Sequence, residues 1–407
     1  MAEKEDIFPA RTAFLKGLVL SKENKNREAI EAFERAKKLD PTISQSAEFQ
    51  IALCYLRDRK LDKAKERFKT TVLQDPLSDL AGFARQYQDM VEKRMYLERP
   101  LRLTIGILGS YDTNMVQKPI EAAAIGYVTD EKVATLQSSV RLDYVPMLEG
   151  PYLFNAQYAF ASNVNEKHTH SHDSMANTFS VSPGYNFGRF AVNLTASYTN
   201  VLLRTDPDVS PPPDSDPGYK RYLDYITYGP TFRVLITQNN ILELFAGYDK
   251  KEYFSQSMLR PEENRDSVGP RAYVSWIWLW RENTFLNLRY DFNKEHADGI
   301  AWENEGNRFT FNASIPVLPA DMVKKVGPLN LQLTGSAYLQ DYKYEVDYGI
   351  KRATRKDKIY TGSVGLTWEF WKYANFVLQY TRTRSDSNVL LYDYKRNLYT
   401  AGLEFRF

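Results

Sequence analysis

Apolar and polar residues alternate with a period of two along most of the chain, from about residue 99 to its last residue. In the closing segment the apolar positions are Tyr399, Ala401, Leu403, Phe405 and Phe407. Thr400, Glu404 and Arg406 lie between them. Successive side chains of a strand point to opposite faces, so this period predicts strands that have one apolar and one polar side. What the apolar side faces decides the kind of protein.

The same alternation recurs throughout the range 99–407. It is regular in 190–202, where aromatic and aliphatic residues alternate with Asn, Thr and Ser. In 152–160 it predicts one strand, whose apolar side carries Tyr152, Phe154, Ala156, Tyr158 and Phe160. The chain holds about 14 such segments, an even number, which is typical of bacterial membrane barrels.

Three features favour a membrane barrel over a two-layer sandwich that is surrounded by water. Charged and amide side chains stand in the middle of the polar faces, as a water-filled lumen requires. Tyr, Trp and Phe begin or end many apolar faces, which is typical of residues at a membrane interface. Short connections alternate with long polar ones, and the exception is the connection at 317–328. We therefore predict that 99–407 forms an antiparallel transmembrane β-barrel of about 14 strands, whose apolar face contacts lipid.

The first part of the chain, residues 1–98, has the helical period instead. Two segments match at an offset of about 35 residues. The first carries Gly17, Ala29, Phe33, Ala36 and Pro41, and the second carries Ala52, Tyr55, Ala64, Phe68 and Pro76. These residues resemble the tetratricopeptide repeat (TPR) pattern, in which small residues let paired helices approach and an aromatic ring fills the gap between them. With a third helical stretch at 78–96 as a cap, the resemblance implies a small α-helical TPR solenoid ahead of the barrel.

The TPR resemblance also implies a binding surface. In that family the first helix of each pair lines a groove, which usually binds a protein or a peptide. The positions that match groove residues are Arg11, Phe14, Leu18, Lys22, Phe49, Leu53 and Arg57. The alternative is that the repeats only brace the barrel.

The end of the chain resembles the C-terminal signature that the barrel-assembly machinery recognises in outer-membrane proteins. The matching residues are the apolar positions of the closing segment, from Tyr399 to Phe407. This resemblance implies an outer-membrane location, a periplasmic helical domain, and the assembly machinery and membrane lipids as partners. We expect a monomer, and we expect the precursor to carry a secretion signal, which the start MAEKEDIFPA does not show.

Composition excludes several other classes of protein. The formal net charge is +2 and no basic cluster interleaves with aromatic residues, so nucleic acid is not an expected partner. No apolar run of about 18 residues exists, so no transmembrane helix is expected. Cys54 is the only cysteine, and we expect it to be a small buried residue of a helix.

Candidate chemistry is sparse. His168, His170 and His172 alternate along one segment and form a weak candidate metal site. The simpler interpretation of that segment is a polar outside loop that binds no metal. No catalytic triad order, phosphate loop or cysteine-rich motif stands out. The sequence therefore predicts neither an enzyme nor a cofactor.

A TPR domain ahead of an outer-membrane barrel resembles the surface lipoprotein assembly modifier (Slam) family. That resemblance implies a translocon that passes a surface lipoprotein or another secreted polypeptide to the cell surface. Exopolysaccharide exporters share the arrangement, so a polysaccharide exporter or an outer-membrane scaffold is the alternative. A solute channel with a TPR docking domain is a third hypothesis. A periplasmic groove favours a polypeptide client, because it raises the concentration of the client at the barrel mouth.

Overall fold

The computed structural model describes residues 9–120, 131–167, 172–204, 218–254, 260–281, 284–349 and 351–407. The chain divides into two compact units, Met1–Arg99 and Pro100–Phe407. The first unit is helical and the second is built around one sheet. Among the described residues, no helix is both long enough and apolar enough to span a membrane.

The first unit consists of short helices joined by tight turns. They are α1 (Pro9–Lys22), α2 (Asn26–Leu39), the 3-10 turn η1 (Pro41–Ile43), α3 (Ser44–Arg57), α4 (Leu61–Gln74) and the longer α5 (Asp79–Glu98). The backbone repeats, because α3 begins 35 residues after α1 and α4 begins 35 residues after α2. The turns before α2 and α4 match as well, with Asn24 and Arg59 in the left-handed region at φ 59° and 56°. The period of the sequence is therefore also a period of the structure.

Small residues set the spacing between paired helices. A Cβ added to Gly17 of α1 would come within 2.6 Å of the ring of Phe33 on α2. Cys54 is fully buried in the same cluster, as predicted for a small helix residue. The second pair repeats this arrangement around Phe68, whose ring centroid lies 5.7 Å from that of Phe49. Each helix pair therefore has a small core, which it shares with the helix that follows: α3 after the first pair and α5 after the second.

The second unit is a closed antiparallel barrel of 14 strands, as predicted. Its strands are β1 (Leu101–Asp112), β2 (Val133–Tyr144), β4 (Ala156–Asn165), β5 (Ser174–Val181), β7 (Phe190–Arg204), β8 (Tyr219–Thr237), β9 (Asn240–Tyr253), β10 (Ser267–Arg281), β11 (Thr284–Ala297), β12 (Asn304–Pro316), β13 (Leu329–Asp347), β14 (Arg352–Trp371), β15 (Ala374–Ser387) and β16 (Tyr394–Arg406). The short strands β3 (Tyr152–Leu153) and β6 (Gly184–Asn186) pair beside β7. Neighbours in the ring follow the chain order, so each connection is a local one.

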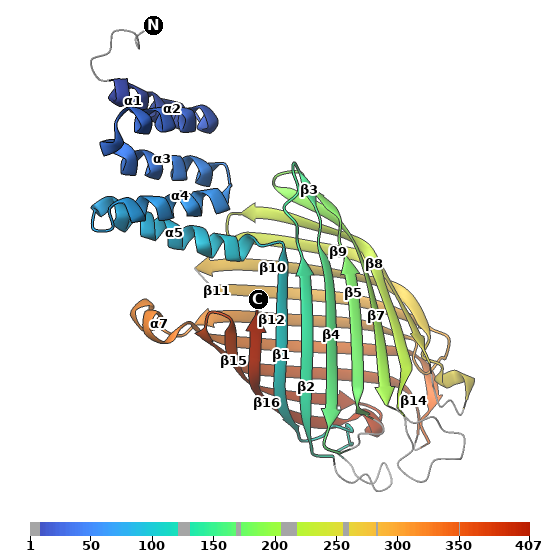
Figure 1. Cartoon of the computed structure of the whole chain (residues 1–407). Coiled ribbons are helices and arrows are strands. Elements are labelled where there is room, and N and C mark those ends of the chain that lie inside the picture. Colours follow the sequence, from blue (N-terminus) through green and yellow to red (C-terminus); the bar gives the residue numbers. More distant parts are fainter. Residues whose placement is uncertain are drawn as a thin grey trace. The chain divides into compact units, whose positions relative to one another are not determined.

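The ring closes where the last strand pairs with the first (Figure 1). Ile107 of β1 lies opposite Leu403 of β16. Leu103 and Phe407 exchange both backbone hydrogen bonds, at 2.9 and 2.8 Å. A closed ring has no unpaired strand edge, which is the condition for a sheet to lie in a membrane.

The two ends of the barrel differ in their connections. At one end, which we call the turn end, β8 and β9 are joined by two residues, as are β14 and β15. Leu101 and Phe407 also lie at the turn end. The other end, which we call the loop end, has longer connections, two of which contain η3 (Pro261–Glu263) and η4 (Leu390–Tyr392). The exceptional turn-end connection at 317–328 contains a helix, α7 (Ala320–Val326).

One predicted strand is wrong. The range 152–160 is not continuous, because β3 ends at Leu153 and β4 begins at Ala156. Asn155 pairs there with Ser182 through backbone hydrogen bonds of 3.2 and 2.7 Å. The next residue, Pro183, has no N–H to donate, so the ladder is interrupted between β5 and β6 on one side and between β3 and β4 on the other.

Candidate functional site

Hydroxyl groups line the inner wall of the barrel at two separate places, along β5 and β7 and along β14 and β15. They bond across neighbouring strands in pairs: Thr178 with Thr199 at 2.9 Å, Ser182 with Thr195 at 2.9 Å, and Ser363 with Thr381 at 2.8 Å. These uncharged groups can act as donors or acceptors toward a passing molecule, much as water does.

The arc from β8 to β11 carries paired charges. The guanidinium of Arg271 lies 3.7 Å from the carboxylates of both Asp249 and Asp291. Arg289 approaches Asp291 at 2.5 Å. Two further pairs are Lys251 with Glu295 at 2.5 Å and Arg233 with Glu243 at 2.6 Å. Four cations therefore face four carboxylates, and this arc presents little net charge to the lumen.

Aromatic rings of this arc lie flat against the wall. The rings of Phe245 and Tyr273 are nearly parallel, with centroids 5.3 Å apart. The guanidinium of Arg289 covers the ring of Tyr273 at 3.7 Å, and Phe245 is only 5% exposed. Gly247 makes room for this packing, since a Cβ there would come within 2.6 Å of the Phe245 ring. These rings are part of the wall and offer no open stacking platform.

A cluster centred on Arg355 lies on the inner side of the barrel at the loop end. Arg355 and Asp357 are inward residues of β14, and the guanidinium donates to the Asp357 carboxylate at 2.6 Å. The same guanidinium lies over three rings, at 3.3 Å from the centroid of Tyr392, 4.2 Å from that of Tyr342 and 5.5 Å from that of Trp302. Tyr392 and Trp302 belong to loop-end connections, so these connections turn inward. We call these five residues the Arg355 cluster.

Backbone hydrogen bonds tie the loop-end connections to one another. The N–H groups of Gly299 and Ala301 donate to the carbonyls of Asn264 and Glu262, both at 3.0 Å. The N–H of Asn388 donates to the carbonyl of Lys356 at 3.2 Å. Through these bonds the β11–β12 connection packs on the β9–β10 connection, and the β15–β16 connection packs on β14.

The outward face of the barrel has two chemically distinct aromatic bands. Toward the turn end, Trp and Phe predominate: Trp276, Trp278, Trp280, Trp368 and Phe370. Toward the middle and the loop end, Tyr predominates: Tyr111, Tyr228, Tyr248, Tyr290, Tyr360, Tyr380 and Tyr399. Such rings suit the boundary between acyl chains and headgroups. The bands support the predicted contact of the apolar face with lipid.

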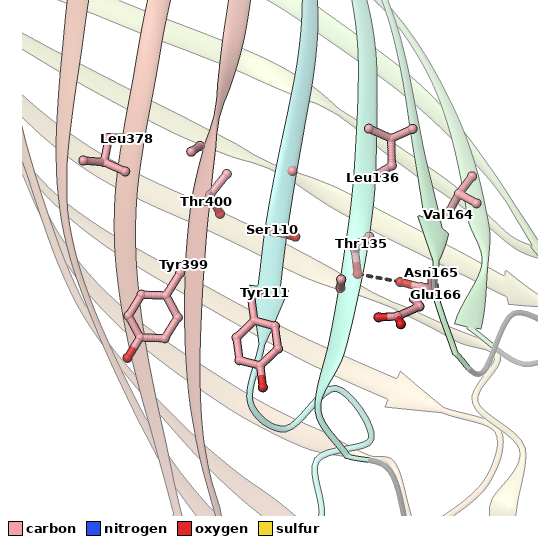
Figure 2. A pocket seen from close by; sticks show the side chains of 13 residues that line it. Ser110, Tyr111, Thr135, Leu136, Val164, Asn165, Glu166, Leu378, Tyr399 and Thr400 are labelled. Atoms are coloured by element: carbon pink, nitrogen blue, oxygen red, sulfur yellow. Dashed lines mark hydrogen bonds between the residues drawn. The ribbon is translucent and has the colours of Figure 1, made fainter.

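A hollow of about 660 Å3 lies across the seam between β16 and β1. Figure 2 shows Tyr111 and Tyr399 side by side at one end of it, with Leu378 on one flank and Leu136 on the other. The residues between these walls are small and outward: Gly109, Ala134 and Ala401. Its lining is largely apolar. The sequence alone does not predict this hollow, because its walls come from strands that are far apart in the chain.

The predicted groove residues lie on two kinds of surface in the helical unit. Arg11 and Lys22 are exposed on α1, and Leu18 is partly buried beside them. Phe14 packs edge-on against Phe33, with ring centroids 5.3 Å apart. Phe49 lies in the core of the second pair, and Leu53 packs against that core. Arg57 donates to the carbonyl of Ser21 at 2.9 Å. Capture of a client by these residues stays a prediction.

The solvent-facing side of α1 carries apolar residues that the sequence pattern did not select. Leu15 and Val19 are 52% and 57% exposed. Leu15 shares this side with Arg11 and Lys22, because these positions are four and seven residues apart on a helix. Helix α1 contains no acidic residue. This side of α1 is therefore basic at its ends and apolar in its middle.

A buried charge cluster joins α2, α3 and α4. Glu48 is 3% exposed and accepts from Lys37 at 2.5 Å and from Arg67 at 3.0 Å. Burial opposes ionisation of the nearby Glu34, but its hydrogen bond to Lys37 and the charges of Lys37 and Arg67 lower the pKa of that carboxyl. Despite burial, the same carboxylates raise the pKa of Lys37 and of Arg67. The cluster connects the two helix pairs.

The candidate metal site lies largely outside the described residues. His168 and His170 are not described, and His172 follows them at the start of the described range 172–204. Within the described ranges, no group of three or more His, Cys, Asp or Glu side chains could hold a metal ion.

Comparison with known proteins gives a likeness of fold. No family model and no curated protein matches this chain. CdiB from Acinetobacter baumannii is 8% identical over 76% of this chain with a TM-score of 0.41, and the match spans 60% of that protein's length. The TodX monoaromatic hydrocarbon channel deltaS2 mutant is 10% identical over 75% of this chain and 89% of its own, with a TM-score of 0.39. A bacterial polysaccharide outer membrane secretin is 11% identical over 76% and 99%, with a TM-score of 0.37.

The closed barrel of the second unit is given by its own strand register, in which β16 pairs with β1. At these identities the comparisons give no substrate. The Arg355 cluster and the seam hollow are known from the structure and not from these likenesses. One signal for the cluster was present in the sequence, since Trp302 and Tyr392 are large aromatic residues within short loop-end connections.

Proposed function

We propose that the protein is an outer-membrane translocon, which binds a polypeptide client through its helical unit and passes it through the barrel to the cell surface. The observation that carries this proposal is the chemistry of the inner wall. The strands β5 and β7 offer hydroxyl pairs such as Thr178 with Thr199, and the strands that follow, β8 to β11, offer paired charges around Arg271. A polypeptide can exchange its bonds with water for bonds with such a wall, and inward apolar residues on β8 to β10 are gathered near the turn end, at Leu235, Ile277 and Leu279.

The helical unit supports a polypeptide rather than a small solute. An exposed helix side with an apolar middle and basic ends, such as that of α1, suits a segment that carries apolar side chains and carboxylates. A diffusing solute needs no such docking surface. The proposal includes no catalytic step and no cofactor.

Polysaccharide export is the second candidate. Sugar rings stack on open aromatic faces, and the lumen rings of Phe245 and Tyr273 are packed against each other and covered by Arg289. A solute channel is the third candidate, and the Arg355 cluster at the loop end argues against a permanently open pore. The wall therefore favours the first candidate over both.

The test is surface exposure of other proteins. The gene is deleted in its native host, intact cells are treated with protease, and the released peptides are compared with those of the parent strain. We expect the deletion to remove one or a few surface proteins while their periplasmic pools remain. Complementation with the full chain restores them.

Variants of the full chain then test the helical unit. L15D/V19D places carboxylates on the apolar middle of α1, and we expect it to fail in complementation. L73D/L77D is the matched control, because Leu73 and Leu77 are 67% and 96% exposed elsewhere in the unit. An unchanged surface proteome in the deletion strain, together with reduced secreted polysaccharide, would instead support the second candidate.

A further inference from the structure

The fold does not require small residues at the bottom of the seam hollow. Gly109 lies opposite Ala401 in the β1–β16 register, and Ala134 lies opposite Tyr111 in the β1–β2 register. A Cβ added to Gly109 would meet no atom closer than 3.9 Å, the carbonyl oxygen of Ala401. Packing and backbone conformation therefore both tolerate a larger residue at Gly109, and the small side chains leave space on the lipid-facing surface.

The size and lining of the hollow fit an apolar chain. It is an open groove of about 660 Å3 on the outward face, so a chain can lie along it without being enclosed. Tyr111, Tyr399, Leu136 and Leu378 wall it, and each is between 46% and 52% exposed. Glu166 is at its β4 edge, so an anionic group is disfavoured on that side.

Basic side chains lie on the opposite edge, toward the loop end of β14, β15 and β16. The registers place Lys358, Arg382 and Lys395 on the outward face, because they lie two or four residues along their strands from the outward Tyr360, Tyr380 and Tyr399. None of the three cations forms an ion pair with any residue in the described part of the chain.

Carboxylates on this edge do not neutralise it. Arg384, on the same face, pairs with Asp393 and lies 3.9 Å from Asp386. Asp386 is the outward carboxylate opposite Lys358. Three cations therefore remain against one partly engaged carboxylate, which gives the edge a positive charge.

The outward residues of β15 and β16 change from charged to aromatic to apolar along the strands, in the same order as the parts of an amphiphilic molecule. From the loop end, the order is a cation, a tyrosine pair and then the hollow: Arg382 opposite Asn397, Tyr380 opposite Tyr399, and Leu378 opposite Ala401. Guanidinium and ammonium groups bind phosphate, tyrosines suit the interface, and the hollow suits a hydrocarbon chain.

We propose that this surface binds one phosphorylated membrane lipid, whose phosphate contacts Arg382, Lys395 and Lys358 and whose acyl chain lies in the hollow over Gly109 and Ala134. The inference rests on the membrane location of the barrel and is independent of the client. It assigns the β14–β1 side of the barrel a specific lipid contact in addition to the general contact that its apolar face makes.

The test uses purified full-length protein in detergent and native mass spectrometry, with bisphosphorylated lipid A, monophosphorylated lipid A and phosphatidylcholine as probes. We expect one retained adduct, with the affinity order bisphosphorylated, monophosphorylated, phosphatidylcholine. R382Q/K395Q is expected to weaken the bisphosphorylated adduct about tenfold and to abolish the preference for phosphate. Inorganic phosphate at the same concentration is expected not to displace the lipid, because it has no chain for the hollow.

Two further variants make the test selective. G109L/A134L fills the hollow and is expected to reduce the affinity for all three lipids while the phosphate preference remains. K250Q/K294Q removes two outward lysines from β9 and β11 and is the charge-matched control, expected to bind as the wild type does. Equal loss in both glutamine variants, no loss in either, or displacement by inorganic phosphate would overturn the proposal. A heat-modifiable gel shift confirms that each variant is folded, and transport assays are not involved.

Discussion

At the scale of single residues, the helical unit depends on positions where one atom more or less decides the packing. Gly17 meets the ring of Phe33, so the first helix pair is already at its closest approach. Gly82 on α5 is different, because a Cβ there would meet no atom within 4 Å. The two glycines are therefore a matched pair for measuring what close approach contributes.

We predict that Gly17→Ala destabilises the helical unit by about 1–3 kcal/mol, because the ring of Phe33 must move. Gly82→Ala is expected to stabilise it by about 0.5–1 kcal/mol, since alanine loses less conformational freedom in a helix. Hydrogen exchange of α1–α5 amides in the full chain measures both effects. Destabilisation of equal size in both variants would contradict the packing argument.

The charge cluster around Glu48 predicts a dependence of stability on pH. The folded-state pKa of Glu34 is lowered, so its stabilising contribution is present above its unfolded value near about 4.3 and is lost as pH falls through the folded value. The folded-state pKa of Lys37 is raised, so its contribution is present below about 10.4 and is lost as pH rises beyond the folded value. The unit is thus expected to be most stable between these limits.

The measurement is hydrogen exchange in α2–α4, corrected for intrinsic rates, at neutral pH and below about pH 4. The protection of the wild type is expected to fall in acid. The protection of the Glu34→Gln variant is expected to fall less, because this variant lacks the ionised contact at neutral pH as well. Glu31→Gln is the control, since Glu31 is exposed on the same helix. An identical acid response of all three proteins would show that Glu34 does not contribute.

At the scale of elements, the loop-end connections behave as a packed group. The Arg355 cluster joins β13, β14 and two connections through one guanidinium, and the Nη1 atom of Arg355 has no hydrogen-bond partner among the described residues. Losing one member of such a buried pair leaves the other charge uncompensated. Arg355 is therefore the side chain on which the contacts of this cluster converge, in addition to the backbone hydrogen bonds between the connections.

We predict that Arg355→Met loosens the cluster by about 3–5 kcal/mol, because Asp357 is left buried without its partner. R355M/D357L is expected to recover most of that loss, since an apolar pair can replace a buried ion pair. The readouts are hydrogen exchange in 298–303 and 388–393 and the conductance of the barrel in planar bilayers. A conductance that is the same in the wild type and the single variant would show that the cluster does not limit the pore.

The sequence predicted the elements well where the pattern is periodic and poorly where contacts are distant. Alternation predicted the barrel strands, and the offset of 35 residues predicted the helix pairs, because both are local properties of the chain. The break at Asn155 was missed, since its cause is Pro183 on a partner strand. Arg355 was missed because its ring partners come from three separate segments.

At the scale of the whole molecule, closure of the ring depends on the last strand. Phe407 pairs with Leu103 through both backbone hydrogen bonds, and its ring stacks on that of Tyr373 with centroids 6.0 Å apart. The resemblance to the assembly signature concerns the same residue. One side chain thus has both a structural contact and a predicted role in assembly.

We predict that Phe407→Ala lowers the yield of heat-modifiable barrel in the membrane several-fold. Arg406→Ala is the neighbouring control, because Arg406 is inward and pairs with Glu404 at 2.7 Å. Semi-native gels of membrane fractions measure the yield. If purified Phe407→Ala refolds in detergent as well as the wild type does, the loss in cells lies in recognition by the assembly machinery. Equal yields of the variant and the wild type in cells would contradict a role of Phe407 in an assembly signature.

The paired charges on the wall have a consequence for motion along the barrel. Because each of the four cations from β8 to β11 has a carboxylate beside it, a charged segment of a client meets attraction and repulsion within one strand spacing. The potential energy along the axis is then shallow, and neither sign of charge is trapped. Under the proposed function, clients of very different composition would travel at similar rates, with the slow step at the loop end.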